Sequence, residues 1–518
     1  VGVTVAELFG LIILHDLMQK KRPILHNFPL IGHLRYLLIE IGPELRQYLV
    51  AHNREEAPFN RLEREWIYAS AERENNNFGF GTDDQLYGIG YPVIKHSVFP
   101  IPDHHSVDPS HHIPCAKLIG AKNKRQRPYR PTSIINISAM SFGSLGMNAI
   151  SSLNNGAKLA GCYHNTGEGG VSPYHRSGAD LCYQLGTGYF GSRNQNGDFS
   201  LERFKDLIAE VPQIRMVEIK LSQGAKPGHG GMLMAPKVTP EIAETRGVPE
   251  YQDCISPSRH SEFSTPNELL DFVERLRDLA GGKPVGIKLC IGHPWEFIAI
   301  VKAMVETGKR IDFVTVDGAE GGTGAAPVEF AQHLGSPLRD ALVFVDNCLR
   351  GAGMRDRVKV AASAKIVSAY DIVKHCALGA DWCNMARPFM FAIGCIQARD
   401  CASGRCPSGV ATMDPKRYRV VDVDDRAKRV HNFHKNTLVA LTEMLEAAGM
   451  THTHQLNRRH IVRRLSASQI KLADQIYPRV EINALIEDKP VDDPRLAAYW
   501  HRVTGDSFAP IDNDRMVS

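Results

Sequence analysis

The sequence has little net charge, no internal repeats and no low-complexity tracts. Its 61 basic and 57 acidic residues leave a formal charge of only +4 over 518 residues, which gives no reason to expect nucleic acid binding. Eleven cysteines scattered over this length do not form the framework of a small disulfide-rich secreted protein, and they indicate a reducing compartment. With 43% hydrophobic residues, the chain can bury a large core and exceeds one average domain.

Long apolar runs are also scarce, and the first one is short. Residues 1–14 contain only Thr4 and Glu7 as polar side chains, but this stretch is too short to cross a bilayer. The basic triplet 20–22 follows it, as in the cytoplasmic flank of a membrane helix. We therefore interpret residues 1–22 as the remnant of a membrane anchor on the cytoplasmic face, or alternatively as an amphipathic helix that docks on a protein surface.

A regular alternation of short β-branched segments and amphipathic helices begins at residue 131. Eight apolar strands joined by helical crossovers over about 260 residues predict an α/β fold, the (β/α)8 TIM barrel. A doubly wound sheet would not need eight such units. We assign 131–412 to the barrel, 23–130 to an N-terminal extension of helices and loops, and 413–518 to a C-terminal helical extension. The expected strands are 133–138, 162–166, 181–185, 215–221, 284–290, 312–317, 357–361 and 381–385.

Several expected strands lead into loops rich in glycine or small polar residues. In a barrel, the carboxyl ends of the strands form the active face. Glycine there lets the backbone and its N–H groups approach a flat aromatic cofactor and its phosphate. The last two strands are the usual place for phosphate, and they end near Ser363, Lys365, Ala386 and Arg387. Ordinary loop chemistry is the alternative for these residues.

Three cysteines lie close together after the last expected strand. Cys395, Cys401 and Cys406 form a C-x5-C-x4-C-P pattern, and thiols at this density oxidise readily unless a metal or a disulfide holds them. Zinc usually takes four ligands with paired C-x2-C spacing, so three cysteines followed by proline favour an iron–sulfur cluster. Zinc with an outside histidine and unliganded thiols are the alternatives.

An ordered set of short segments carries a resemblance to a known family. The segments are 140–144 (MSFGS), 165–170 (NTGEGG), 219–228 (IKLSQGAKPG), 255–257 (ISP), 287–289 (IKL), 321–327 (GGTGAAP) and the cysteine run into 410–412 (VAT). With these segments, residues 131–412 resemble the FMN-binding synthase domain of glutamate synthases. The resemblance implies FMN at the barrel mouth and a [3Fe-4S] cluster on the three cysteines. It also implies reduction of 2-iminoglutarate, formed from 2-oxoglutarate and ammonia, to L-glutamate.

The resemblance also implies roles for individual residues. Lys288 is expected near the flavin and the substrate, where its ammonium would stabilise the reduced flavin. Glu168 is expected near the substrate. The alternatives are a structural ion pair for Lys288 and a helix-side charge for Glu168. The residues expected to line FMN are Met140, Ser141, Gln184, Lys288, Gly322, Thr323, Gly324, Ser363, Lys365, Ala386 and Arg387.

The chain departs from the family pattern in three loops. These are 290–295 (CIGHPW), Ala319-Glu320 in place of His-Asp, and 361–365 (AASAK), which lacks paired glycines. No segment is interpreted as a glutaminase nucleophile or a dinucleotide-binding fingerprint. We therefore expect ammonia from solution or a separate amidotransferase subunit, and electrons from ferredoxin or another protein. An N-methylglutamate synthase-type subunit that uses an amine, and a membrane-attached electron-transfer flavoprotein without amino-acid turnover, are the alternatives.

Overall fold

The computed structural model describes the chain except for residues 1, 75–78, 103–112, 114, 116 and 510–518. Contacts divide it into two units, one ending at Trp66 and the other beginning at Ile67. In the first unit, α1 (Gly2–Met18), α2 (Pro23–Asn27) and α3 (Gly32–Leu45) are followed by a π-helical turn (Arg46–Val50). Helix α4 (Arg61–Glu72) includes the division between the units. None of the described helices combines the length and the apolar character needed to cross a membrane.

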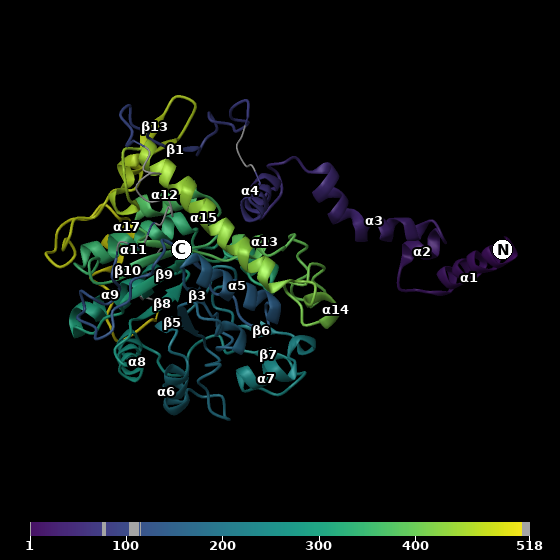
Figure 1. Cartoon of the computed structure of the whole chain (residues 1–518), viewed down its shortest axis with the longest axis horizontal. Helices are drawn as coiled ribbons and strands as arrows, with labels where there is room; N and C mark the ends of the chain where they lie inside the picture. Colours follow the sequence, from purple (N-terminus) through teal and green to yellow (C-terminus); the bar gives the residue numbers. More distant parts are fainter. Residues whose placement is uncertain (1, 75–78, 103–112, 114, 116, 510–518) are drawn as a thin grey trace. The chain divides into compact units, whose positions relative to one another are not determined.

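The second unit contains a closed barrel of eight parallel strands, which confirms the predicted fold (Figure 1). Every position of these strands is buried except Arg215, as expected for strands with helices on one side and a packed barrel interior on the other. The seventh strand of the barrel begins and ends two residues later than predicted. In barrel order the strands are β2 (Ile135–Ile137), β3 (His164–Asn165), β4 (Leu181–Leu185), β5 (Ile214–Lys220), β8 (Val285–Leu289), β9 (Phe313–Asp317), β10 (Lys359–Ser363) and β11 (Trp382–Met385).

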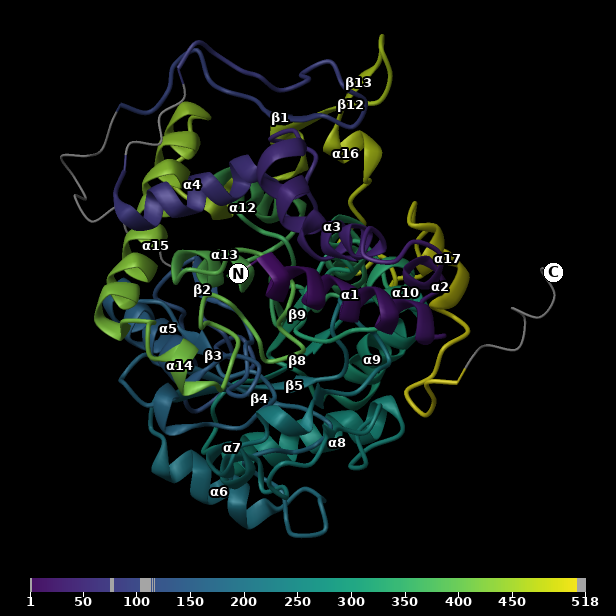
Figure 2. The ribbon, with the colours of Figure 1, turned by 90° about the vertical axis from the view of Figure 1, so that its right-hand side faces the viewer.

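Amphipathic helices surround the strands (Figure 2). Helix α8 shows how the sequence determines where these helices begin. Thr265 and Glu268 form a capping box at its N-terminus, and Pro266 is its first residue. Its Leu269, Phe272, Val273 and Leu276 are buried at the i, i+3, i+4, i+7 spacing of an amphipathic helix. The helices of this layer are α5 (Met147–Ala160), α6 (Leu201–Glu210), α8 (Pro266–Leu279), α9 (Pro294–Thr307), α11 (Leu338–Gly351) and α12 (Ala369–Leu378).

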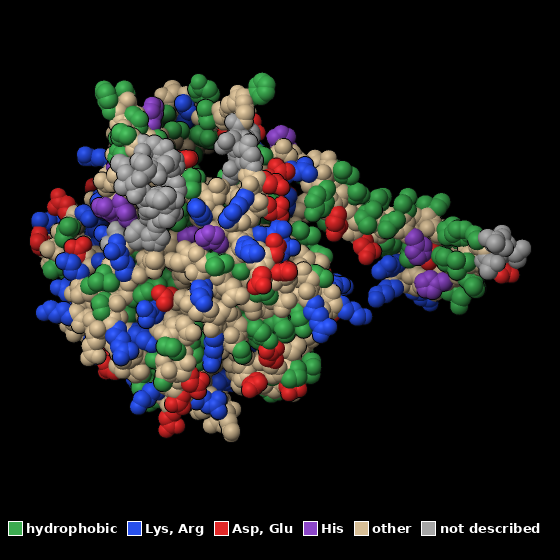
Figure 3. All heavy atoms as spheres, in the orientation of Figure 1, with side chains coloured by type: hydrophobic (Ala, Val, Ile, Leu, Met, Phe, Trp, Pro, Cys, Tyr) green, Lys and Arg blue, Asp and Glu red, His purple; other side chains and the backbone are tan. Residues whose placement is uncertain are grey.

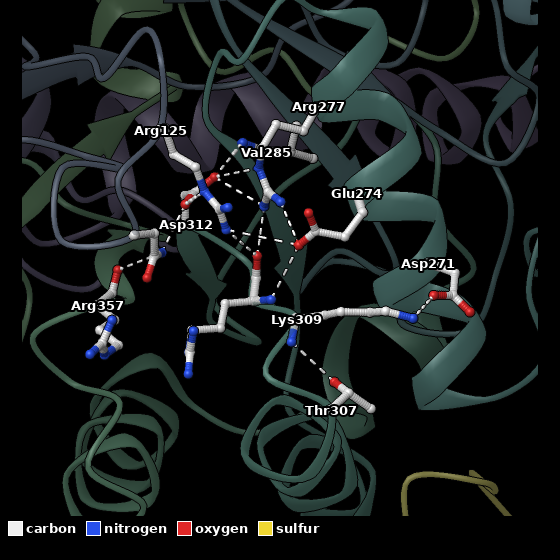
Figure 4. Close-up of polar contacts among 11 residues, drawn as sticks. Arg125, Asp271, Glu274, Arg277, Val285, Thr307, Lys309, Asp312 and Arg357 are labelled. Carbon is white, nitrogen blue, oxygen red and sulfur yellow. Dashed lines mark hydrogen bonds and ion pairs between the residues drawn. The ribbon is translucent and has the colours of Figure 1, made fainter.

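A buried aspartate joins several elements at the amino-terminal pole of the barrel (Figure 4). Asp312 precedes β9 and is fully buried. It accepts hydrogen bonds from Arg125 Nε and Asn123 Nδ2, both at 2.8 Å, and from Arg277 Nε at 3.2 Å. Removing one partner from a buried ion pair costs about 3–5 kcal/mol, so this network holds the pole opposite the active face.

Shorter elements complete the barrel loops and the carboxyl-terminal region. Strands β6 (Met232–Leu233) and β7 (Cys254–Ile255) pair, and they flank α7 (Pro240–Arg246). Helix α10 (Val328–His333) follows β9, and α13 (Arg387–Ala392) follows β11. The carboxyl-terminal helices are α14 (Pro415–Tyr418), α15 (Val423–Ala447), α16 (Ala473–Ile476) and α17 (Pro494–Tyr499).

The carboxyl-terminal extension also contains strands that the helical prediction did not include. Strand β12 (Ile461–Arg464) pairs with β1 (Pro92–Ile94) on one side and with β13 (Ile470–Leu472) on the other. In this part of the extension, which was predicted to be helical, residues 470–472 form β13 and the helix begins only at Ala473. A backbone partner in β12 outweighs the local helix pattern of this short segment.

Candidate active site

The residues predicted to bind the cofactor come from one end of the barrel. Gln184 and Lys288 belong to β4 and β8, and Ser363 is the last residue of β10. The others follow β2, β9, β10 or β11, and because all eight strands are parallel their carboxyl ends share one mouth. These others are Met140, Ser141, Gly322, Thr323, Gly324, Lys365, Ala386 and Arg387.

An ion pair between Glu168 and Lys220 lies at this mouth. Glu168 belongs to the loop after β3, Lys220 ends β5, and the carboxylate Oε1 is 2.8 Å from the ammonium Nζ. Burial raises the pKa of the Glu168 carboxyl, but Lys220, and after it Arg246, outweigh burial and hold the pKa below its ordinary value. Glu168 is therefore ionised at neutral pH, and it faces cations rather than solvent on a helix side.

Two glycines leave the space that the Glu168 carboxylate occupies. A Cβ atom on Gly186 would lie 2.7 Å from its Oε2, and one on Gly231 would lie 2.8 Å from its Oε1. No dinucleotide fingerprint was identified from the sequence, but the loop 186–191 has its G-x-G-x-x-G spacing. The next helix begins only at Leu201, so this loop lacks the helix N-terminus that binds a pyrophosphate.

A small polar pocket beside the ion pair contains two further buried cations. Lys226 and Arg246 are only 2% and 5% exposed. Burial lowers the pKa of Lys226, although Glu168 opposes that effect. With Lys220, three cations face one carboxylate, so the pocket suits an anion. Its lining residues are Ser141, Ser144, Glu168, Phe190, Lys226, Gly231, Met232, Arg246, Ser256 and Thr323.

Arg246 has donor capacity that the described protein does not use. Its Nη2 donates to the Phe142 carbonyl oxygen at 2.9 Å, and its guanidinium lies 5.1 Å from the centre of the Phe190 ring. Its buried Nε has no hydrogen-bond partner among the residues that the structure describes. Sequence interpretation did not single out Arg246 or Lys226, because the pocket joins α7 to the loops after β3 and β5. The only signal was the position of Lys226 in a glycine-containing loop after a strand.

Lys288 forms an ion pair inside the mouth. Its Nζ lies 3.4 Å from Asp317 Oδ2, and the same oxygen accepts a hydrogen bond from Gly224 N at 2.9 Å. Burial lowers the pKa of Lys288, but Asp317, followed by Glu218 and Glu168, raises it above the ordinary value. The ammonium is therefore charged at neutral pH. The structural ion pair that we considered for Lys288 is present.

Glu218 is a second buried carboxylate that sequence interpretation did not single out. It is 1% exposed and accepts hydrogen bonds from Gln184 Nε2 at 2.7 Å, Asn165 Nδ2 at 2.8 Å and Thr315 Oγ1 at 2.5 Å. The signal was the two-residue period of β5, which directs Glu218 and Lys220 to the same side of the strand. Through these bonds Glu218 fixes the amide of Gln184.

The loop after β10 keeps a glycine-like backbone without glycine. Ala364 has φ 140° and Lys365 has φ 38°, which are conformations that L-residues other than glycine rarely adopt. Ala364 and Lys365 thus have positive φ angles although neither is the glycine that the family pattern has in this loop. Strain of this kind concentrates at binding sites. Nearby, Ser363 Oγ lies 3.3 Å from Ser138 Oγ.

The two other departing loops are held by protein contacts. Glu320 Oε2 accepts a hydrogen bond from Leu338 N at 2.9 Å, at the start of α11, and the Glu320 carbonyl accepts one from Arg387 Nη2 at 2.6 Å. In loop 290–295, His293 stacks on Trp295 with ring centres 4.1 Å apart. Cys290 is buried, and burial raises the pKa of its thiol to about 12. These contacts give both loops structural roles.

The cysteine run lies beside the loop predicted to bind FMN. A Cβ atom on Gly324 would be 3.9 Å from Cys401 Cβ. Burial, and then the neighbouring Cys406, raises the pKa of Cys401. Lys237 Nζ donates to the Cys401 carbonyl at 3.3 Å. The Cys395 carbonyl accepts a hydrogen bond from Tyr68 Oη at 2.7 Å.

Among the described residues, the three cysteines are not arranged as a metal site. Within the described part of the chain, no group of three or more His, Cys, Asp or Glu side chains is arranged to hold a metal ion. Of the three thiols, Cys406 is close enough to Cys401 to raise its pKa. The iron–sulfur cluster therefore stays a prediction from the cysteine spacing.

The fold and its charged mouth place this protein among the (β/α)8-barrel enzymes, whose reactive groups lie at the carboxyl ends of the strands. Residues 111–451 match the sequence model of a family described as the conserved region in glutamate synthase. This match covers more than half of the chain, so the chain belongs to the glutamate synthase family, a family of oxidoreductases. The match confirms the resemblance seen in the sequence.

Two relatives and one solved structure illustrate the similarity. The glutamate synthase large subunit-like protein YerD of Bacillus subtilis (strain 168) is 39% identical over 502 residues, covering 90% of this chain and 95% of that protein. The archaeal glutamate synthase [NADPH] of Methanocaldococcus jannaschii is 36% identical over 324 residues, covering 62% of this chain and 60% of the relative. A flavocytochrome b2 mutant with sulfite bound is 13% identical with a TM-score of 0.44, covering 96% of each chain.

Proposed function

We propose that this protein reduces an imino acid, formed from 2-oxoglutarate and ammonia, to L-glutamate. The observation that carries the proposal is the pocket in which Lys226 and Arg246 flank the Glu168–Lys220 pair. A dicarboxylic oxo acid offers two negative charges to these cations. The buried Arg246 Nε, which has no hydrogen-bond partner among the described residues, supplies a donor that a substrate carboxylate would satisfy.

Glu168 has the charge needed to hold the nitrogen of the substrate. Its carboxylate is ionised at neutral pH, because its pKa is lowered. It therefore accepts hydrogen bonds from a protonated imine and favours that form. Reduction of a protonated imine needs one hydride at the C=N carbon. The electron pair of the C=N π bond then moves onto the nitrogen, which becomes a neutral amine. Lys220 keeps Glu168 in place throughout.

We further propose that FMN binds at the mouth of the barrel. The residues that would hold it are those gathered there: Met140, Ser141, Gln184, Lys288, Gly322, Thr323, Gly324, Ser363, Lys365, Ala386 and Arg387. The donor set fits a flavin phosphate and ring, because it combines cationic side chains with a positive-φ loop at 364–365. When bound, FMN supplies the hydride.

Lys288, Asp317 and Glu218 would prepare the site for that cofactor. Asp317 holds the Lys288 ammonium in a buried position, where a fixed positive charge favours an anionic reduced ring. Glu218 uses the amide nitrogen of Gln184, which leaves the amide oxygen of Gln184 to accept a hydrogen bond. The catalytic roles proposed here are those of Lys288 and Glu168.

Other parts of the proposal concern partners. A [3Fe-4S] cluster on Cys395, Cys401 and Cys406 would accept single electrons from a protein donor such as ferredoxin. Ammonia would come from solution or from a separate amidotransferase subunit. The alternative of an electron-transfer flavoprotein without turnover has less support, since the Arg246 Nε and the buried Lys226 are suited to an anionic substrate.

The test is anaerobic reoxidation of the chemically reduced flavin, followed by its absorbance. We expect reoxidation with 2-oxoglutarate plus ammonium, and a much slower reaction with the monocarboxylate 2-oxobutyrate plus ammonium. Faster reoxidation with methylamine than with ammonium would favour the N-methylglutamate alternative. No reoxidation by any oxo acid and amine would contradict amino-acid turnover. Reduction of the resting flavin by NADPH, but not by reduced ferredoxin, would contradict the protein donor.

A further inference from the structure

The first 50 residues expose an unusual amount of apolar surface. We call helices α1 and α3 with the turn 46–50 the apolar arm. In Figure 3, apolar side chains gather along this segment. A large exposed apolar patch is typical of a surface that binds another protein or a membrane. Its exposed large apolar residues are Val5, Leu8, Phe9, Leu11, Ile13, Leu14, Leu17, Met18, Leu34, Leu37, Leu38, Ile39, Ile41, Leu45, Tyr48, Leu49 and Val50.

Helix α1 has no polar side along its described residues. Its exposed apolar side chains point in all directions, since Leu8, Phe9 and Leu14 lie at about 0°, 100° and 240° around the helix axis, at roughly 100° per residue. The described acidic residues in α1 are Glu7 and Asp16. A helix that is apolar all round is normally buried all round. A protein groove or a second copy of this chain would cover one side of α1, whereas lipid would cover every side.

Near the end of α1, the acidic Asp16 is buried and the basic residues 20–22 are exposed. Asp16 is fully buried and accepts hydrogen bonds from Leu30 N at 3.0 Å and from His33 Nε2 at 2.9 Å. These bonds close the turn between α1 and α3, and they keep the carboxylate away from the surrounding medium. The side chains that remain exposed just after α1 are those of the triplet Lys20–Arg22.

The basic triplet identifies the kind of apolar phase. Lysine and arginine beside an apolar helix interact with the anionic headgroups of phospholipids, at about 1 kcal/mol for each residue near the surface. Helix α1 has 17 residues, which at about 1.5 Å per residue gives a length close to 25 Å. That is shorter than a hydrocarbon core of about 30 Å. The residues of α1 can therefore lie within the apolar layer of a bilayer.

We propose that the apolar arm seats this protein on an anionic phospholipid membrane. Helix α1 enters the apolar layer, the triplet 20–22 lies among the headgroups, and the exposed side chains of α3 rest at the interface. The Asp16 hydrogen bonds keep the two helices in one arrangement while they do so. This inference is independent of the proposed reaction, because it uses only residues before position 51.

The experiment is vesicle flotation of the full chain in low salt without detergent. We expect the protein to float with vesicles of phosphatidylglycerol and phosphatidylcholine, and to float less with phosphatidylcholine alone. Leu11→Glu/Leu14→Glu places two charges on α1 and should lower the floated fraction at least about ten-fold. Lys20→Glu/Lys21→Glu should remove the dependence on the anionic lipid. The matched control is Ile482→Glu, which changes a side chain of similar exposure, 61%, in the other unit and should float like the parent.

Oligomeric state separates lipid from a protein occupant of the arm. If α1 covers a second copy, light scattering will show a dimer that Leu11→Glu/Leu14→Glu converts to a monomer, and vesicles will not bind. If the arm covers the chain's own second unit, vesicles will not bind and the double variant will leave the oligomeric state unchanged. The double variant will then lower thermal stability instead. Either of these two results overturns the proposal.

Discussion

The carboxylate of Glu168 lies 2.8 Å from the ammonium of Lys220, although the two residues reach the barrel mouth from different strands. Glu168 follows β3 and Lys220 ends β5. Between β3 and β5 lies β4, whose following residue, Gly186, leaves room for the carboxylate. Three consecutive strands of the barrel thus combine to place one ionised acid beside a pocket of cations.

This pair predicts a pH dependence of stability. The pKa of Glu168 is lowered from 4.5 in the folded protein. A depressed pKa contributes stability that is complete above the unfolded value and is lost as pH falls through the folded value. We expect the free energy of unfolding to decrease below pH 4.5, and Glu168→Gln to flatten that decrease. At pH 7 the substitution should cost about 3 kcal/mol, because the buried Lys220 loses its partner.

Urea unfolding between pH 3 and pH 7, measured for both proteins, provides the check. The control is Glu262→Gln, since Glu262 pairs with Arg275 in a more exposed position and should change stability by less than about 1 kcal/mol. Equal losses in the two variants would show that Glu168 has no special role in the fold.

Arg246 should contribute chiefly to binding of the oxo acid. Arg246→Met removes the Nε donor, which has no partner within the described part of the chain. We expect KM for 2-oxoglutarate to rise by about 10- to 100-fold with a smaller change in kcat. The matched control is Arg193→Met, because Arg193 lies over the same Phe190 ring at 5.5 Å but does not line the pocket. Steady-state kinetics of both variants decide the matter. A KM change of the same size in Arg193→Met would contradict the assignment.

Lys288 should matter for the chemical step. Lys288→Met is expected to retain FMN and to slow imino-acid reduction about 100-fold, as losing one focused charge often does. The substitution also leaves Asp317 buried without its cation, which lowers stability. Lys288→Met/Asp317→Asn removes that second effect, so a slow but stable double variant would identify the loss of the charge as the cause. Single-turnover kinetics and thermal unfolding measure the two effects, and an unchanged rate in both variants would refute the role.

Much of the fold could be predicted because the barrel repeats one local pattern. The strand Leu181–Leu185 is an apolar segment that begins and ends at the predicted residues. Helix α8 has its own start signal, the capping box of Thr265 and Glu268. The substrate pocket could not be predicted in the same way. Lys226 and Arg246 are brought together with Glu168 only by the closed barrel and α7, and no local pattern marks three residues so far apart in sequence.

The strained loop after β10 gives a stability prediction. Ala364 has φ 140°, a region where glycine avoids the clash of a Cβ atom. Ala364→Gly should therefore leave stability unchanged or raise it, by up to about 1 kcal/mol. Ala362→Gly is the control, because Ala362 lies inside β10 with its backbone in the sheet, and it should lose roughly 1 kcal/mol. Chemical denaturation compares them, and a clear loss in Ala364→Gly would contradict strain at this position.

The cysteine run gives the last prediction, which concerns the metal content. Cys401 is only partly buried and lies next to the Gly322–Gly324 loop, and Cys406 is close enough to raise its pKa. The third predicted ligand, Cys395, lies three residues beyond the end of α13. If these residues bind a [3Fe-4S] cluster, anaerobically purified and then oxidised protein should contain about three iron atoms per chain and show the EPR signal of a three-iron cluster. Cys401→Ser should lose that iron while the flavin absorbance remains. Cys162→Ala, at a buried cysteine beyond the carboxyl end of α5, should keep both. Stoichiometric zinc without iron would instead establish the zinc alternative, and the absence of any metal would contradict the cluster.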